Sequence, residues 1–145
     1  MMDETAFDPL KLENQLCFPL YACAREVVKR YTPYLDEIGL TYTQYVVMMV
    51  MWEYRQITSR EIGEKLRLDS GTLTPVLKKL EERGLVGRCR SREDERNLLV
   101  TLTAEGLALR QRALDIPRRI GECIPLSPSD AIALHDILHR LLSSL

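Results

Sequence analysis

Apolar residues recur every three to four positions along most of the chain, and this spacing predicts a largely helical protein. Residues 10–35 form the first expected helix. One face of it would carry Cys17, Tyr21, Ala24, Val28 and Tyr31. Pro19 either kinks this helix or marks its first turn. The turn EIGL ends it, because Gly39 suits the left-handed conformation that commonly closes a helix.

Two further helices are expected before residue 67. The segment TYTQYVVMMVMWEYR is apolar nearly all round, which predicts a buried helix capped by Thr41 or Thr43. The segment ITSREIGEKL predicts a short helix in which Thr58 and Glu61 have the spacing of a capping box. A buried helix followed closely by a short one is the usual lead-in to a helix-turn-helix unit.

The next helix has two different faces. It starts after Asp69 or Ser70, runs to Arg83 and closes at Gly84. Its apolar stripe is Leu73, Val76, Leu77 and Leu80. The opposite face carries hydroxyl and lysine side chains: Ser70, Thr72, Thr74, Lys78 and Lys79. One side is therefore suited to a core and the other to a polar partner.

The pattern changes to short strands after this helix. LVGRC and NLLVTL predict two strands, and the charged segment RSREDER between them predicts an extended hairpin. A fifth helix follows, capped by Thr103 and bent or split at Pro117. A last helix begins after Ser127 with Pro128 at its first position. The order of elements indicates a mainly α (α+β) fold, a winged helix-turn-helix flanked by terminal helices.

Composition supports a single globular domain, and charge adds one detail. The 145 residues are 46% hydrophobic and 28% charged, with a net charge of −1. Residues 55–96 hold 11 basic and eight acidic side chains, or +3, which leaves −4 for the rest. A basic middle favours contact with phosphates. An acidic N-terminus without a secretory pattern, and an apolar run YVVMMVMW too short for a membrane span, indicate a cytoplasmic protein.

Neither a disulfide scaffold nor a metal centre is favoured by the cysteines and histidines. Cys17, Cys23, Cys89 and Cys123 are far apart and form no C-x-x-C motif. His135 and His139 have a spacing that can bind metal, but no carboxylate or cysteine cluster accompanies them in the sequence. No metal and no cofactor are therefore expected.

A family resemblance adds to this reading. SREIGEKLRLDSGTLTPVLKKLEERGLVGRCRSREDERNLLVTLTAEG resembles the MarR family of bacterial transcription regulators. The N-terminal LENQLCFPLYACAREVVKRYTPYLDEIGLTYTQYVVMMVMWE is similar to its organic-hydroperoxide-sensing branch, OhrR, of the two-cysteine type. The resemblance implies a homodimer that binds a pseudo-palindromic operator. It assigns residues 1–42 and 103–145 to dimerisation and 43–102 to a winged DNA-binding lobe.

The expected DNA contacts lie in that middle segment. They are Ser70, Thr72, Thr74, Lys78 and Lys79 on the recognition helix, and Arg88, Arg90, Arg92, Asp94 and Arg96 on the wing. The resemblance places Arg96 at the DNA and gives Asp94 an orienting role.

Cys17 is the candidate redox centre. Tyr21, one turn along, can approach Cys17 in the same chain, whereas Tyr31 lies 14 residues on, about 21 Å along a straight helix. Tyr31 and Tyr42 could instead reach the cysteine of a second chain. The resemblance implies that these two tyrosines of one subunit hold the reactive cysteine of the other. Without it, Cys17 would more simply be a buried interface cysteine among aromatic residues.

The resemblance also implies that Cys123 resolves oxidised Cys17 through a disulfide across the dimer. The alternative is an inert Cys123, with oxidation ending in a mixed disulfide with a small thiol. Cys23, six residues from Cys17, lies about 9 Å along the helix and outside disulfide range.

These features together predict a repressor, not an enzyme. Organic hydroperoxide would oxidise Cys17 and release the operator. One alternative is a MarR-type regulator released by a small aromatic ligand in the cleft between the dimer and DNA lobes. Another is a thiol peroxidase, which would require catalytic turnover.

Overall fold

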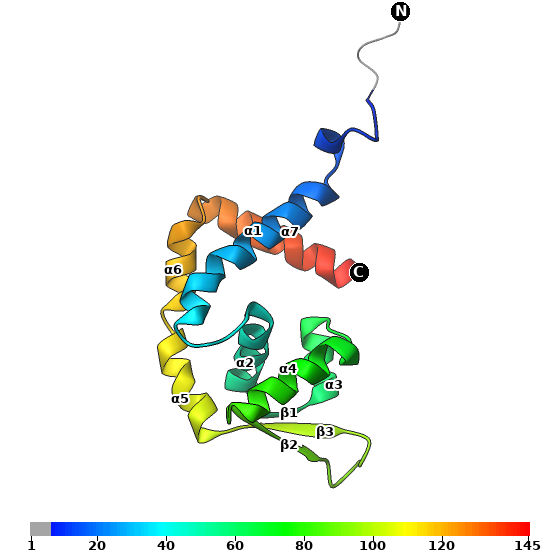
Figure 1. The fold of residues 1–145 in the computed structure, drawn as a ribbon. Helices are drawn as coiled ribbons and strands as arrows, with labels where there is room; N and C mark the ends of the chain where they lie inside the picture. The colour runs from blue at the N-terminus through cyan, green and yellow to red at the C-terminus, as the bar shows by residue number, and fades with distance from the viewer. Residues whose placement is uncertain (1–6) are drawn as a thin grey trace, which may run out of the picture.

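The computed structural model describes residues 7–145 of the chain, which fold into seven α-helices, a 3₁₀ helix and one three-stranded sheet (Figure 1). The elements are η1 (Leu12–Asn14), α1 (Cys17–Asp36), α2 (Tyr42–Tyr54), β1 (Gln56–Thr58), α3 (Ser59–Leu66), α4 (Ser70–Glu82), β2 (Val86–Arg90), β3 (Leu98–Leu102), α5 (Ala104–Ala113), α6 (Ile116–Cys123) and α7 (Pro128–Ser144). Together they confirm the predicted mainly helical winged helix-turn-helix.

The helices of the winged lobe, which we define as α2 to β3, begin where side chains satisfy their free N–H groups. The Thr41 hydroxyl accepts the backbone N–H of Gln44, whose side chain accepts the N–H of Thr41 in return. Thr58 and Glu61 form the same box at the start of α3, as predicted. Asp69 accepts the N–H of Thr72 and so caps α4.

The sheet has one strand more than predicted. β3 lies between β1 and β2, and both pairings are antiparallel. We expected Ile57 to begin a helix, but Ile57 pairs with Val100 of β3 and buries its side chain. A three-residue strand has too little alternation to be recognised beside a capping box, so this part of the prediction was wrong.

Helix α2 lies at the centre of the lobe. Val47, Met48 and Met51 have no exposed surface, as expected of a helix that is apolar all round. Ile62 of α3 and Leu80 of α4 are equally buried. The fold of the lobe therefore rests on a core closed within one chain.

The first helix starts later than its periodicity suggested. Residues 10–35 were expected to form it, but η1 precedes it and α1 begins at Cys17. A helix running through from residue 10 would press the Pro19 ring against the carbonyl of Gln15. Pro19 instead lies in the first turn of α1, and Gln15 is extended.

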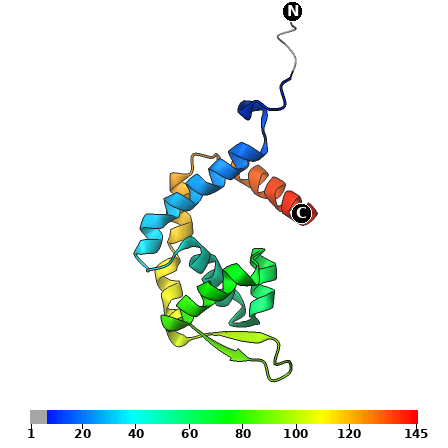
Figure 2. The same cartoon turned by 45° about the vertical axis from the view of Figure 1, so that its right-hand side comes forward.

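The other terminal elements follow their proline signals. Pro117 lies in the first turn of α6 and separates it from α5, and Ser127 caps α7 ahead of Pro128. Figures 1 and 2 show α5 and α6 running along one side of the molecule, with α1 and α7 at the end opposite the wing hairpin. Within residues 7–145, no helix is both long and apolar enough to cross a bilayer.

Candidate redox site and nucleic-acid interface

Cys17 is the first residue of α1 and is exposed in the single chain. Its apolar neighbours are exposed as well, Leu16 at 82% and Phe18 at 44%. Tyr21 lies one turn farther on, and its ring faces the guanidinium of Arg25 at 5.3 Å. The predicted approach of Tyr21 to Cys17 stays a prediction. An exposed thiol within an apolar surface is suited to burial against a second chain.

Tyr31 and Tyr42 are brought together in one chain. Their rings lie edge to face with centroids 5.0 Å apart, and Tyr45 packs against both at 5.8 and 6.4 Å. Trp52 extends the group, and its indole N–H donates to the carbonyl of Gly106 at 2.8 Å. The two tyrosines that the sequence singled out thus form a fixed pair with half-buried rings.

The phenols of Tyr31 and Tyr45 are kept protonated. Burial raises the pKa of Tyr45 to about 12, with smaller contributions from Tyr31 and Tyr42. Burial, followed by the neighbouring Tyr42, also raises the pKa of Tyr31. A protonated phenol is a hydrogen-bond donor, so Tyr31 can donate to a sulfur that reaches it.

Tyr31 and Cys17 lie toward opposite ends of α1. The helix is continuous from Cys17 to Asp36, and the 14 residues between the two correspond to about 21 Å. Cys17 therefore cannot contact the tyrosine pair of its own chain.

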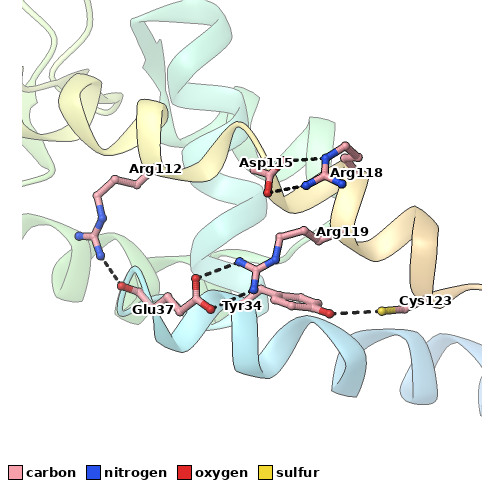
Figure 3. A network of polar contacts seen from close by, with 7 residues as sticks. All are labelled: Tyr34, Glu37, Arg112, Asp115, Arg118, Arg119 and Cys123. Carbon is pink, nitrogen blue, oxygen red and sulfur yellow. Dashed lines mark hydrogen bonds and ion pairs between the residues drawn. The ribbon is translucent and has the colours of Figure 1, made fainter.

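Cys123 ends α6 and contacts α1 (Figure 3). The Tyr34 hydroxyl lies 3.2 Å from its sulfur, and the Arg119 guanidinium covers the Tyr34 ring at 4.1 Å. Arg119 also donates to both carboxylate oxygens of Glu37, at 2.9 and 3.1 Å. The hydrogen bond with Cys123 is the main cause of a raised pKa at Tyr34, which keeps this phenol protonated too.

The sequence did not indicate Tyr34 as a site residue. Its partners Arg119 and Cys123 are more than 80 residues away in the chain, and no local spacing connects them. A weak signal existed: Tyr34 follows Tyr31 by three residues and so lies one turn farther along α1.

The other two cysteines have no comparable surroundings. Cys23 is exposed on α1, and Cys89 is exposed on β2, opposite Leu99 of β3. All four cysteines of the chain are free thiols. His135 and His139 stack with ring centroids 4.1 Å apart, and no group of three metal-ligating side chains occurs among residues 7–145.

The recognition helix α4 divides as its sequence predicts. Leu73, Leu77 and Leu80 are buried against the lobe. The opposite face is exposed and carries the expected set Ser70, Thr72, Thr74, Lys78 and Lys79. An open cavity of about 530 Å³ lies between α3, α4 and the wing, lined by Arg60, Arg67 and Arg96 among others.

The wing residues differ in how free they are. Asp94 accepts the backbone N–H of Arg96 at 3.0 Å and so fixes the turn, and Arg96 is exposed at the rim of the cavity. Arg92 is exposed, whereas Arg90 donates to the carbonyl of Glu95 at 2.8 Å.

Arg88 points into the lobe. Its guanidinium pairs with Glu81 of α4 at 3.2 Å, its backbone N–H donates to the same carboxylate at 2.9 Å, and only 20% of its side chain is exposed. The structure gives Arg88 a bracing contact between α4 and β2, so its assignment to DNA stays a prediction.

Several known proteins resemble this chain over nearly its whole length. A model of the transcriptional regulators SarA/Rot matches residues 29–112. The organic hydroperoxide resistance transcriptional regulator of Bacillus subtilis (strain 168) is 48% identical over 142 residues, 98% of this chain and 97% of that protein. The HTH-type transcriptional regulator SarZ of Staphylococcus aureus (strain USA300) is 41% identical over 130 residues, 90% of this chain and 86% of that protein.

Solved structures of AbfR of Staphylococcus epidermidis are 36% identical to the chain and cover 92% of it. Reduced AbfR bound to DNA aligns with a TM-score of 0.72 over 94% of its chain, and overoxidised AbfR bound to DNA with 0.73 over 95%. The disulfide form of AbfR aligns with only 0.61, over 88% of its chain. A further crystal structure of AbfR, not described as bound to DNA, aligns with 0.73 over 92% of its chain, so among these structures of equal identity only the disulfide form differs clearly in shape from the present chain.

Proposed function

Since the chain belongs to the MarR-type family of transcriptional regulators that includes the organic hydroperoxide resistance regulator and SarZ, we propose that it is a peroxide-responsive repressor. A reduced dimer holds its operator. An organic hydroperoxide oxidises Cys17, and the dimer then releases the DNA.

One observation carries this proposal: Cys17 and the groups suited to it lie toward opposite ends of α1. Tyr31 packs against Tyr42, and Tyr34, one turn from Tyr31 on α1, contacts Cys123. These contacts place Tyr31, Tyr42 and Cys123 in one region, which we call the acceptor end of α1. Neither set is complete within one chain. A two-fold dimer that brings Cys17 of each chain to the acceptor end of the other completes both sites at once.

The terminal helices supply the surface for such a dimer. No residue of α7 is buried, although Leu134, Ile137 and Leu141 follow one another along one face. Leu16, Phe18 and Leu20 expose a further apolar surface beside Cys17. Contiguous apolar surface of this kind marks an interaction site.

The chemistry takes two steps. The Cys17 thiolate, held by phenol donors, attacks the terminal oxygen of the hydroperoxide, so that an S–O bond forms, the O–O bond breaks and an alcohol leaves. The sulfenic acid is then attacked by the thiolate of Cys123 from the partner subunit. A disulfide forms and the oxygen leaves as water after taking a proton from solvent.

Release follows from the change of shape at the interface. Overoxidised AbfR still holds DNA, whereas its disulfide form departs further from the shape seen here. We therefore assign release to the disulfide and not to oxygen added on Cys17. The disulfide draws α1 and α6 of different subunits together, which changes the spacing of the two α4 helices on the operator.

The DNA contacts of this proposal lie on α4 and the wing. Ser70, Thr72 and Thr74 open the recognition helix, where hydroxyl groups reach phosphates and base edges. Lys78 and Lys79 are exposed farther along it. Arg96 and Arg92 on the wing face solvent, where they can enter the adjacent minor groove.

The test uses DNA that the reduced protein selects from a random duplex pool. Cys17→Ser should bind this DNA like the wild type but keep it in the presence of cumene hydroperoxide, whereas the wild type releases it. Cys89→Ser, a matched change at another exposed cysteine, should respond normally. Fluorescence anisotropy of labelled DNA measures both states, and release from Cys17→Ser at the wild-type dose would refute the proposal.

A second candidate function, release of DNA by a small aromatic ligand, rests on a different cavity. Tyr45, Met49 and Trp52 line an apolar pocket of about 370 Å³ whose rim carries Glu53 and Arg110. A small aromatic acid could bind there and move α5 relative to α2. In that case phenolic acids would release the DNA and hydroperoxide would not.

A further inference from the structure

We propose that Tyr34 is a positioning residue for the second oxidation step: braced by Arg119 and Glu37, it holds and primes Cys123 for attack on oxidised Cys17 of the partner subunit. This inference rests on the proposed redox function and adds a residue to it. It starts from a chain of contacts between α1 and α6 that Figure 3 shows from close by.

Tyr34 is held at its hydroxyl by the Cys123 sulfur and at its ring face by Arg119, which Glu37 in turn orients. The phenol lies 3.2 Å from the Cys123 sulfur, within the range of a hydrogen bond to sulfur. The Arg119 guanidinium lies 4.1 Å from the ring centroid, which holds the ring from its face. Two hydrogen bonds from Arg119 to Glu37 set the plane of that guanidinium in turn.

The bracing is anchored in the backbone as well. Arg112 of α5 donates to the carbonyl oxygen of Glu37, the residue that follows the last turn of α1. Arg119 and Cys123 are one turn apart on α6, so both ends of the contact chain lie on the same short helix. The Tyr34 hydroxyl therefore has little freedom to leave the sulfur unless α6 moves relative to α1.

Tyr34 lies beside Cys123 of its own chain and far from Cys17 of that chain. It lies 17 residues after Cys17, about 25 Å along the helix, which excludes a disulfide between Cys17 and Cys123 of one chain in this structure. Tyr31 is one turn away from Tyr34 on the same helix. A partner cysteine that reaches the Tyr31–Tyr42 pair thus arrives beside the sulfur that Tyr34 holds.

The chemistry of the second step is helped by a hydrogen-bond donor at this point. Resolution needs Cys123 as thiolate, which attacks the sulfur of the Cys17 sulfenic acid and forms the S–S bond, while the S–O bond breaks and the oxygen leaves as hydroxide that takes a proton from solvent. A phenol O–H that donates to the sulfur stabilises the thiolate and restricts its position. Cys123 is exposed, so an incoming sulfenic acid can reach it.

The test separates the two oxidation steps in the full-length protein. After one equivalent of cumene hydroperoxide, quenched samples are analysed by intact mass, with dimedone to trap sulfenic acid and non-reducing gels to follow the linked dimer. In Tyr34→Phe, sulfenic acid should form at the wild-type rate and the disulfide about 10-fold more slowly. Tyr54→Phe changes a phenol of α2 whose ring contacts Lys65, and it should match the wild type in both steps.

A second variant tests the bracing without touching the phenol. Arg119→Met removes the guanidinium from the ring and frees Glu37, so the disulfide should form several-fold more slowly while the first step is unchanged. Iodoacetamide labelling of Cys123 in the reduced protein gives an independent reading. At one fixed pH, Tyr34→Phe should slow that labelling, because the sulfur loses its hydrogen-bond partner, whereas Tyr54→Phe should leave it unchanged.

The possible outcomes separate the role of Tyr34 from the proposed redox sensor. Disulfide formation in Tyr34→Phe at or above the wild-type rate would overturn the inference and leave the redox sensor intact. Sulfenic acid that never converts to a linked dimer in the wild type would also overturn it, while DNA release by a small-thiol adduct would preserve the sensor. No oxidation of Cys17 at all would overturn both.

Discussion

The winged lobe and the terminal helices use apolar residues in opposite ways. In the lobe, Met48, Ile62 and Val100 are completely buried by their own chain. In α7, no side chain is buried, and Leu141 and Ile137 remain 40% and 52% exposed. The lobe therefore has a core that is closed within one chain, whereas the terminal helices leave their apolar surface uncovered. The oxidation chemistry that we propose lies in the terminal helices, where it can alter how two chains meet.

On the proposed function, this division explains how a thiol in the terminal helices controls a distant DNA surface. α1 packs on α2 of the lobe and on α6, which carries Cys123. A rigid lobe transmits a change in the dimer interface as a change in the position of α4, without needing to deform itself. The comparison between the two regions can be tested by changes that should affect one and spare the other.

The largest effect is expected from a charge in the apolar stripe of α7. Leu141→Glu removes one apolar side chain from each protomer, about 2 kcal/mol apiece, so the dimer should weaken roughly 1000-fold. Sedimentation velocity over a dilution series measures this. Ser143→Glu, on the opposite face of the same helix, is the control and should leave the dimer unchanged. A variant Leu141→Glu that sediments as the wild type would mean that α7 is not at the interface.

The next effect contrasts the same substitution in both regions. Leu77→Ala should lower the free energy of unfolding of the lobe by about 3 kcal/mol, because Leu77 is 1% exposed and its loss leaves a cavity. Leu134→Ala in α7, 43% exposed, should change lobe stability little. Trp52 is the single tryptophan and lies in the lobe, so its fluorescence during urea unfolding reports on the lobe directly. Equal losses for the two variants would show that lobe and terminal helices unfold together.

The lobe was also the region that the sequence predicted best. Periodicity and caps located α2, α3 and α4 within a few residues, because Thr41, Thr58 and Asp69 each act on a residue three positions away. The wing hairpin was recognised from alternation and charge. Strand β1 was missed, since its only strong signal is that Ile57 pairs with a strand more than 40 residues later.

The candidate site was predictable only in part. The tyrosine pair was selected by resemblance and found close together. Its proposed relation to Cys17 lies between chains, because the length of α1 keeps the two apart within one chain. Tyr34 and Arg119 could not be selected, because their meeting depends on how α6 packs on α1. Arg88 shows the converse: a charged residue at an expected surface position is held inward by Glu81.

A smaller effect should separate the arginines of the wing. Arg96→Ala should weaken DNA binding about 10-fold and reduce the slope of log affinity against log salt by about 1, as expected when one phosphate contact is lost. Arg88→Ala should leave that slope unchanged and instead lower lobe stability, because it breaks the contact with Glu81. Titrations at four salt concentrations measure the slopes. An equal reduction of slope by Arg88→Ala would restore Arg88 to the DNA interface.

The smallest effect compares two helix caps of the same kind, one in each region. Thr58→Ala should lower the unfolding free energy of the lobe by about 1 kcal/mol, since it removes the acceptor at the start of α3. Ser127→Ala removes the same kind of cap from α7, which has no buried residue in the single chain. Its cost should appear only at protein concentrations at which the dimer forms. A cost for Ser127→Ala that is independent of concentration would mean that α7 is stabilised within its own chain.

The stabilising effect of the Thr58 cap on α3 should depend on pH. Hydrogen bonds from the Thr58 hydroxyl and then its backbone N–H hold the pKa of Glu61 below its ordinary value of 4.5. A lowered folded-state pKa stabilises the protein above the unfolded value, and this contribution is lost as the pH falls through the folded value. The stability difference between wild type and Thr58→Ala should therefore be constant from pH 7 to about pH 5 and shrink below pH 4.5. Urea unfolding followed by Trp52 fluorescence at several pH values measures it, and a difference that persists unchanged at low pH would show that the hydroxyl caps α3 without help from the Glu61 carboxylate.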